Sequence, residues 1–255
     1  MARHRAVKFD EHLSLVEHLD ELRTRLIVSI AALLVASALC FWQNDLLLEI
    51  ANRPLPGDLV PITFGVTEPF MTTVTLSIYG GILVALPVIL YQAYAYVLPA
   101  FSPRERRVVL PFLLMVPFLF IAGVVFAYFV VIPAATKFLL NFNAAEFNIE
   151  VRAREYYSFF ALTCISIGVL FQIPIGVLAV TRLGITTPEQ LARNRKYAIL
   201  VIAVVAMLLP GTDPVTMLIS MLPLVLLFEL SLLLARLFGR PPDEAAAGRA
   251  AEEAG

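Results

Sequence analysis

Residues 69–98 have the sequence PFMTTVTLSIYGGILVALPVILYQAYAYVL, without a single charged side chain. About 20 apolar residues in a helix are enough to cross the ~30 Å hydrocarbon core of a bilayer. Runs of similar character recur at Leu22–Trp42, Arg107–Ile132 and Tyr156–Leu183. These runs are too long for the core helices of a soluble domain, so we predict an all-α polytopic membrane protein.

The composition of the 255-residue chain agrees with this class. It is 60% hydrophobic and 15% charged, with a mean hydropathy of +0.84, whereas soluble domains carry about 25% charged residues. Soluble, fibrous, disulfide-stapled and disordered classes are therefore excluded for most of the chain. Cys40 and Cys164 both lie in apolar runs, where we expect buried free thiols rather than a disulfide.

Two further apolar runs near the C-terminus are less typical. They cover Tyr197–Leu209 and Val215–Phe238 and are separated by the breaker Pro210–Pro214. The first has about 13 residues, or roughly 20 Å of helix, which is shorter than a bilayer. We predict six transmembrane helices with a short fifth, where the membrane thins or protein covers the helix end. The alternative is a re-entrant pair.

The N-terminal segment is polar and has no apolar h-region, so it is not a cleavable signal peptide. Leucines 15, 19, 22 and 26 recur at helical spacing and predict an amphipathic lead-in helix. The predicted organisation is a cytoplasmic N-terminal amphipathic segment (1–21), a six-span membrane domain (22–239) and a disordered cytoplasmic tail (240–255).

The basic residues predict the orientation of the chain. All but four of the 19 Lys and Arg residues lie on one side of the predicted spans; the exceptions are Arg53, Lys137, Arg152 and Arg154. Cytoplasmic loops carry the excess of Lys and Arg. Both termini are therefore predicted to be cytoplasmic.

Four prolines lie within the predicted spans, at positions 87, 111, 117 and 174. Each lacks a backbone donor and tends to kink its helix. Kinks in three successive helices favour a curved wall with a concave groove. For any one of them, including Pro87, simple tolerance of proline in a membrane helix is an equally good explanation.

Several acidic residues have ordinary structural explanations. Glu21 precedes Arg25 by four residues, which predicts an ion pair on the helix surface. Glu105 fits a capping box with Ser102 as N-cap and Pro103 at the first helical position. Asp213, directly before Pro214, is a suitable N-cap for the last span.

Glu229 differs because it lies inside the last apolar run, where a carboxylate is a functional hypothesis by default. Gln92 and Gln172 are milder cases. The three histidines all lie near the N-terminus, and the chain has no HExxH motif, no GxSxG within a span and no glycine-rich phosphate loop. We therefore expect neither an enzyme nor a metal or other cofactor. The lack of an inverted repeat weakens a secondary-transporter interpretation.

The segment His18-Leu19-Asp20-Glu21-Leu22-Arg23-Thr24-Arg25-Leu26 closely resembles the N-terminal signature of the TatC family, the core subunit of the twin-arginine protein translocase. Other similar stretches follow in order over about Leu15–Gly239. They are Glu68-Pro69-Phe70, residues 87–92 (PVILYQ), 98–101 (LPAF), 105–107 (ERR), 126–129 (FAYF), 171–174 (FQIP), 184–186 (GIT) and 227–230 (LFEL).

This resemblance implies a receptor for folded precursor proteins whose signal peptides carry paired arginines. The family's acidic acceptors correspond here to Glu21 and Glu105, with Arg23 and Tyr96 shaping the site and Gln92 in its inner wall. Guanidinium groups pair with carboxylates through two parallel hydrogen bonds, which a lysine cannot match.

The resemblance also implies TatA- and TatB-type single-span partners, self-association in a larger complex, contact with membrane lipids and no nucleic acid. It implies a bacterial or archaeal cytoplasmic membrane and the proton-motive force as energy source. Many members have a Glu where this chain has Gln172. We expect the amide to hold water or a partner's polar group; otherwise a proton-linked step is absent or uses Glu229. Glu68, Pro87, Gln172, Asp213 and Glu229 are thus predicted to be structural or polar membrane residues. The alternative function is a secondary transporter of a small solute, with Glu229 and Gln172 as ligands.

Overall fold

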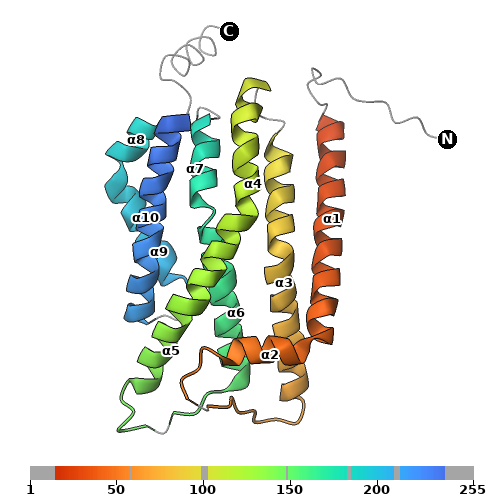
Figure 1. The fold of residues 1–255 in the computed structure, drawn as a ribbon, viewed down its shortest axis with the longest axis vertical. Helices are drawn as coiled ribbons and strands as arrows, with labels where there is room; N and C mark the ends of the chain where they lie inside the picture. Colours follow the sequence, from red (N-terminus) through yellow and green to blue (C-terminus); the bar gives the residue numbers. More distant parts are fainter. Residues whose placement is uncertain are drawn as a thin grey trace, which may run out of the picture.

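The computed structural model describes residues 15–57, 59–98, 103–147, 149–182, 185–209 and 213–238. This part of the chain is helical, with one isolated β-bridge (Figure 1). Its elements are α1 (Leu15–Trp42), α2 (Asn44–Asn52), α3 (Glu68–Val97), α4 (Pro103–Phe126), the π-helical turn η2 (Ala127–Val131), α5 (Ile132–Asn141), α6 (Ala153–Leu170), α7 (Ile173–Arg182), α8 (Pro188–Arg193), α9 (Arg195–Met207) and α10 (Pro214–Phe238).

Among the described residues, five helical segments are long and apolar enough to cross a membrane. They are His18–Trp42, Glu68–Val97, Leu113–Asn141, Ala153–Arg182 and Pro214–Leu237. The all-α membrane class is therefore confirmed. The short helix predicted near the C-terminus is α9, whose 13 residues span about 20 Å.

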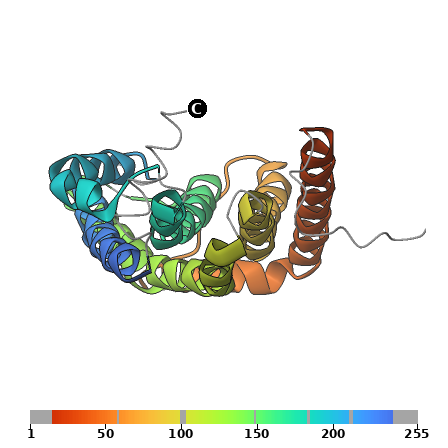
Figure 2. The ribbon, with the colours of Figure 1, turned by 90° about the horizontal axis from the view of Figure 1, so that it is seen from above.

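The long helices lie side by side along the long axis of the molecule (Figure 1). Seen from above, α1 lies at one edge and α8–α10 at the other, with the remaining long helices between them (Figure 2). We call the end where α1 begins and α10 ends the upper end, and the opposite end, which carries α2, the lower end. Arg53, Lys137, Arg152 and Arg154 belong to the elements of the lower end. The four exceptions in the charge pattern thus share one end.

The structure corrects three predicted boundaries. Between the apolar runs that end at Trp42 and begin at Pro69, where no helix was predicted, the chain forms α2, which lies across the lower end (Figure 1). The third run continues past Ile132 through η2 and α5 to Asn141. The sequence predicted an end there because Pro133 and Lys137 interrupt the apolar run. The helix nevertheless continues through Pro133, which lies just after the π-helical turn η2, where the regular hydrogen-bond ladder is already altered.

The fourth run is two helices rather than one. The chain turns at Phe171 and Gln172, between α6 and α7, directly before Pro174. Because proline cannot donate to the carbonyl four residues earlier, the predicted disturbance at Pro174 is confirmed. By contrast, α3 continues without a break through Pro87.

Helix α1 packs mainly on α3, and small residues allow the two backbones to approach closely. A Cβ atom placed on Gly81 would lie 2.6 Å from the Cα of Ser37 and would also overlap its Oγ. A Cβ on Gly80 would come within 3.2 Å of the side chains of Cys40 in α1 and Leu47 in α2. Most of α1 otherwise faces outward, with Leu34 65% exposed, as expected for a helix that contacts lipid.

Tyrosines fasten α2 to the long helices at the lower end. The hydroxyls of Tyr128 and Tyr156 donate to the carbonyls of Ile50 and Ala51 at 3.0 and 2.6 Å. A helix end leaves four carbonyls without intrahelical partners, and these tyrosines satisfy two carbonyls in the last turn of α2. Below them, Ile62 pairs with residues 151–153 in a parallel bridge.

The contact between α1 and α3 provides a test of this packing. We expect Gly81→Ala to lower the unfolding free energy by about 1–3 kcal/mol, because the new methyl group has to displace backbone at Ser37. The matched control is Gly176→Ala in α7, where a Cβ would meet nothing within 4 Å. That change should be neutral or stabilise the helix by up to about 1 kcal/mol. Thermal unfolding in detergent measures both, and equal effects would contradict the packing.

Candidate functional site

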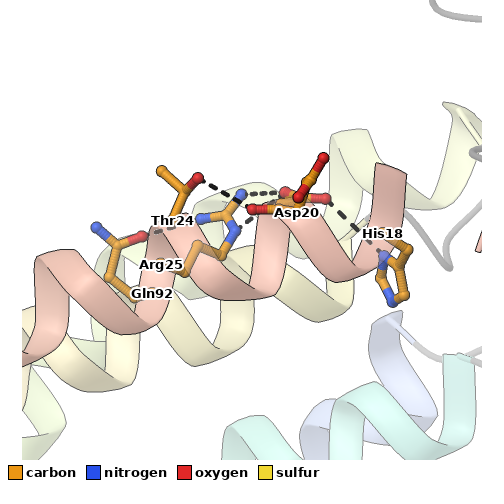
Figure 3. Close-up of polar contacts among 6 residues, drawn as sticks. His18, Asp20, Thr24, Arg25 and Gln92 are labelled. Atoms are coloured by element: carbon orange, nitrogen blue, oxygen red, sulfur yellow. Dashed lines mark hydrogen bonds and ion pairs between the residues drawn. The ribbon is translucent and has the colours of Figure 1, made fainter. Parts of the chain in front are cut away.

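The upper ends of α1 and α3 are joined by a cluster of polar side chains (Figure 3). Arg25 donates from Nε to Glu21 Oε1 at 3.0 Å and also from Nη2 to the same oxygen. Its remaining terminal nitrogen, Nη1, donates to Gln92 Oε1 on α3 at 3.0 Å. Both Glu21 and Arg25 have side chains that are 25% exposed. The predicted ion pair is therefore present, and it lies largely inside the α1–α3 contact.

An aromatic contact extends the cluster toward the start of α1. The His18 and Tyr96 rings stack with centroids 4.3 Å apart and an interplanar angle of 14°. His18 Nδ1 also lies 4.0 Å from Glu21 Oε2. The structure thus brings Glu21, Gln92 and Tyr96 together, as the resemblance implied.

Two members of the cluster, His18 and Arg25, were not predicted as site residues. Positions 18, 21 and 25 lie on one face of a helix because they are three and four residues apart. This spacing is visible in the sequence, but the partner helix is not. Arg23 lies two residues from Glu21, about 200° around the helix, and it is exposed and outside the cluster.

Glu105 falls in the first turn of α4, but its side chain lies outside the described residues, as does Ser102. Helix α4 begins at Pro103, as the capping-box prediction required. Because α3 and α4 pack together and are connected at the upper end, Glu105 belongs to the same end of the molecule as Glu21.

Gln172 lies in the turn between α6 and α7 and is only 5% exposed. Its Nε2 donates to the carbonyl of Val116 on α4 at 3.2 Å, while Oε1 is buried without a partner among the described residues. Further along the same two helices, α4 packs closely on α6, because a Cβ on Gly123 would lie 2.9 Å from the Cα of Gly168. One amide oxygen therefore remains available for a donor.

Glu229 is not a solitary carboxylate. Arg195 Nη2 donates to Glu229 Oε2 at 2.8 Å, and the two side chains are 49% and 42% exposed. Arg195 is the first residue of the short α9, and the pair lies about two and a half turns before the end of α10 at Phe238. The sequence marked Glu229 as an acid inside an apolar run, and the structure adds that the short α9 places a cation beside it.

The other two acids have structural partners. Asp213 caps α10 as predicted, since its Oδ1 accepts from the backbone N–H of Thr216 at 2.8 Å. Glu68 begins α3 and accepts from Arg152 Nε and from the backbone N–H of Phe64, both at 2.8 Å.

A family model described as Sec-independent protein translocase protein (TatC) matches residues 17–223. The chain belongs to the TatC family. A TatC of Carboxydothermus hydrogenoformans is 36% identical over 236 residues, covering 92% of this chain and 97% of that protein. A TatC of Aquifex aeolicus is 36% identical over 237 residues, covering 91% and 98% of the two chains.

A solved structure gives the same assignment. The crystal structure of a twin-arginine translocase receptor TatC in the detergent DDM is 36% identical, with a TM-score of 0.76, and it covers 88% of this chain and 100% of that one. The resemblance drawn from residues 18–26 is confirmed. This TatC protein is a component of a protein translocase, so the solute-transporter alternative is set aside.

The α1–α3 cluster makes a prediction about stability. Gln92→Leu removes the acceptor of Arg25 Nη1, and loss of a hydrogen bond to a charged group costs about 1.5–3 kcal/mol. Because Arg25 is 25% exposed, we expect the lower part of that range. The control Gln43→Leu alters an exposed glutamine without a cap hydrogen bond and should change stability by less than about 0.5 kcal/mol. Thermal unfolding compares the two, and equal losses would contradict the bond.

Proposed function

We propose that this TatC protein receives the twin-arginine signal peptide of a folded precursor at the upper ends of α1, α3 and α4, with Glu21 as one acceptor. The observation that supports this most is the geometry of Glu21, which already holds a guanidinium from its own chain. A partly buried carboxylate in that arrangement suits the planar fork of arginine.

Arg25 then acts as a placeholder for the incoming arginine. In the empty receptor it neutralises Glu21, which would otherwise lose solvation without a partner. When a signal arginine takes over Glu21, Nη1 of Arg25 keeps its bond to Gln92. The exchange replaces one ion pair by another, so selectivity depends on how well the second signal arginine is accommodated.

Glu105 is the proposed acceptor for that second arginine. It lies in the first turn of α4, where a carboxylate is favoured by the helix dipole, and at the same end as Glu21. Arg23 and Tyr96 complete the proposed site, with Gln92 in its inner wall. The arginines around this end disfavour loosely basic segments, whereas two carboxylates accept a specific pair.

The membrane arrangement is proposed as follows. Residues 22–239 form six spans, with α9 as the short fifth, the segments 1–21 and 240–255 are cytoplasmic, and the upper end faces the cytoplasm of a bacterium or archaeon. The charge distribution supports this orientation, because the four exceptional basic residues gather at the lower end. Residues 1–14 and 239–255 lie outside the described part of the chain.

The proposed partners are TatA- and TatB-type single-span subunits and further copies of this chain, and the proposed energy source is the proton-motive force. The short α9 and the Arg195–Glu229 pair set polar groups deep beside α10. We propose that the bilayer thins there and that a concave groove formed by the kinked helices holds the apolar part of the signal. Gln172 then offers its free amide oxygen to water or to a partner's donor.

Site-specific crosslinking tests the acceptors. We expect Glu21→Gln and Glu105→Gln each to weaken binding of a twin-arginine precursor by roughly tenfold or more, because a charge-assisted pair becomes a neutral contact. Asp20→Asn is the matched control, since Asp20 is exposed on the neighbouring position of α1. A precursor with paired lysines should bind weakly to every variant. Normal binding by both glutamine variants would refute the site.

The placeholder role predicts the opposite sign for Arg25. Arg25→Gln leaves Glu21 without its internal cation, so the precursor should bind roughly fivefold more tightly, which corresponds to an ion pair of about 1 kcal/mol. Binding is measured with a labelled signal peptide on detergent-solubilised protein that retains its unfolding temperature. Weaker binding than wild type would show that Arg25 supports the site rather than occupying it.

A further inference from the structure

A cavity of about 550 Å³ opens at the lower end, far from the α1–α3 cluster. It lies between the start of α3 and the segment that leads into α6. Its lining combines residues before and within the first turns of α3 with two arginines of the α6 side. These residues are Phe64, Gly65, Thr67, Glu68, Met71, Thr72, Thr75, Arg152 and Arg154.

The two arginines that line this cavity differ in their hydrogen bonds and ion pairs. Arg152 bonds Glu68 and contacts Glu155, and the Glu68 carboxylate raises the pKa of the Arg152 guanidinium, which keeps it charged. Arg154 forms no hydrogen bond or ion pair with any described residue. Glu155 is 75% exposed and lines a separate cavity on the other side of Arg152. Since Arg152 already neutralises Glu68, the cavity keeps one unpaired positive charge.

A buried hydroxyl is also without a partner. Thr72 is 6% exposed, lines the cavity, and its Oγ1 is buried with no hydrogen-bond partner among the described residues. An unsatisfied polar group in such a position is unfavourable by about the value of a lost hydrogen bond. Arg154 is an exposed cation without a partner, and a rotation of the Thr72 side chain would turn its buried hydroxyl toward the same space. Together they indicate an anionic ligand with several oxygen acceptors.

The depth of the cavity identifies the source of that anion. Glu68 marks the first residue of a membrane-spanning helix, and Thr72 and Thr75 lie about 6 and 10 Å further along it. The polar interface of a bilayer is about 5–8 Å thick on each side of the hydrocarbon core. Met71, which lines the cavity and is 58% exposed, presents apolar surface there. A phospholipid places its phosphate at this height and its acyl chains just below it.

We infer that this cavity binds the phosphate of a phospholipid headgroup from the leaflet at the lower end. Arg154 pairs with a phosphate oxygen, and the Thr72 hydroxyl donates to the same group after its side chain rotates toward the cavity. Arg152 forms the floor through its pair with Glu68. The bound lipid joins the first turns of α3 and α6, which are also connected by the bridge between Ile62 and Arg152.

Photocrosslinking tests this site on the full chain in phosphatidylcholine vesicles that contain a trace of photoactivatable phosphatidylglycerol. Adducts are mapped by mass spectrometry to residues 64–75 and 152–158. We expect Arg154→Gln to reduce adduct formation there roughly fivefold, as for loss of one basic contact at a lipid surface. Thr72→Val should reduce it roughly threefold. Neither change removes a hydrogen bond or ion pair with a described residue, so neither variant should lose thermal stability.

The matched control is Lys137→Gln, which removes an exposed positive charge from the same end but outside the cavity. It should leave the adducts unchanged. Equal losses with Lys137→Gln, or no loss with Arg154→Gln, would overturn the site. Competition by excess sodium phosphate as strong as that by unlabelled phosphatidylglycerol would show that the ligand is free phosphate and overturn the assignment to lipid.

Discussion

Charged and polar side chains in an apolar helical protein need partners, and this requirement organises the whole molecule. Isolated charges lose solvation at or near the hydrocarbon region, and only ion pairs or hydrogen bonds offset that loss. Glu21 pairs with Arg25, Glu68 with Arg152, and Glu229 with Arg195. The second pair joins α3 to the residue before α6, 84 positions away, and the third joins the consecutive helices α9 and α10. The same interactions that make the acids tolerable therefore also fix how the helices are arranged.

Much of the fold follows from the lengths of the apolar runs and from the positions of the prolines that interrupt them. The runs at Leu22–Trp42 and Pro69–Leu98 correspond closely to α1 and α3, because a helix that spans lipid satisfies its own backbone. Helix α2 escaped prediction because nine residues with polar ends give no membrane signal, and it is stabilised by tyrosines from elsewhere in the chain. Tertiary hydrogen bonds of that kind have no local pattern.

The candidate site, like the fold, was predictable from the sequence only in part. The four-residue spacing of Glu21 and Arg25 predicted their ion pair. Nothing in that spacing showed that Gln92 binds the same guanidinium. Similarly, Glu229 stood out as an acid in an apolar run, while its neutralisation by Arg195 depends on how α9 packs against α10. Helix faces can be calculated from a sequence. Which faces meet is decided by packing, for example by the close approach that Gly81 permits between α1 and α3.

The tyrosine contacts and the parallel bridge at the lower end have a mechanical consequence. They join α2, the segment before α3 and the start of α6 to one another, so little relative motion is available to the helices there. At the upper end, α1 is held by one neighbour and a few exchangeable polar contacts. The lower end therefore forms a rigid base, and the upper ends of the helices are the part of the molecule that can move. A displacement of α1 at the upper end is therefore expected to decrease toward the lower end.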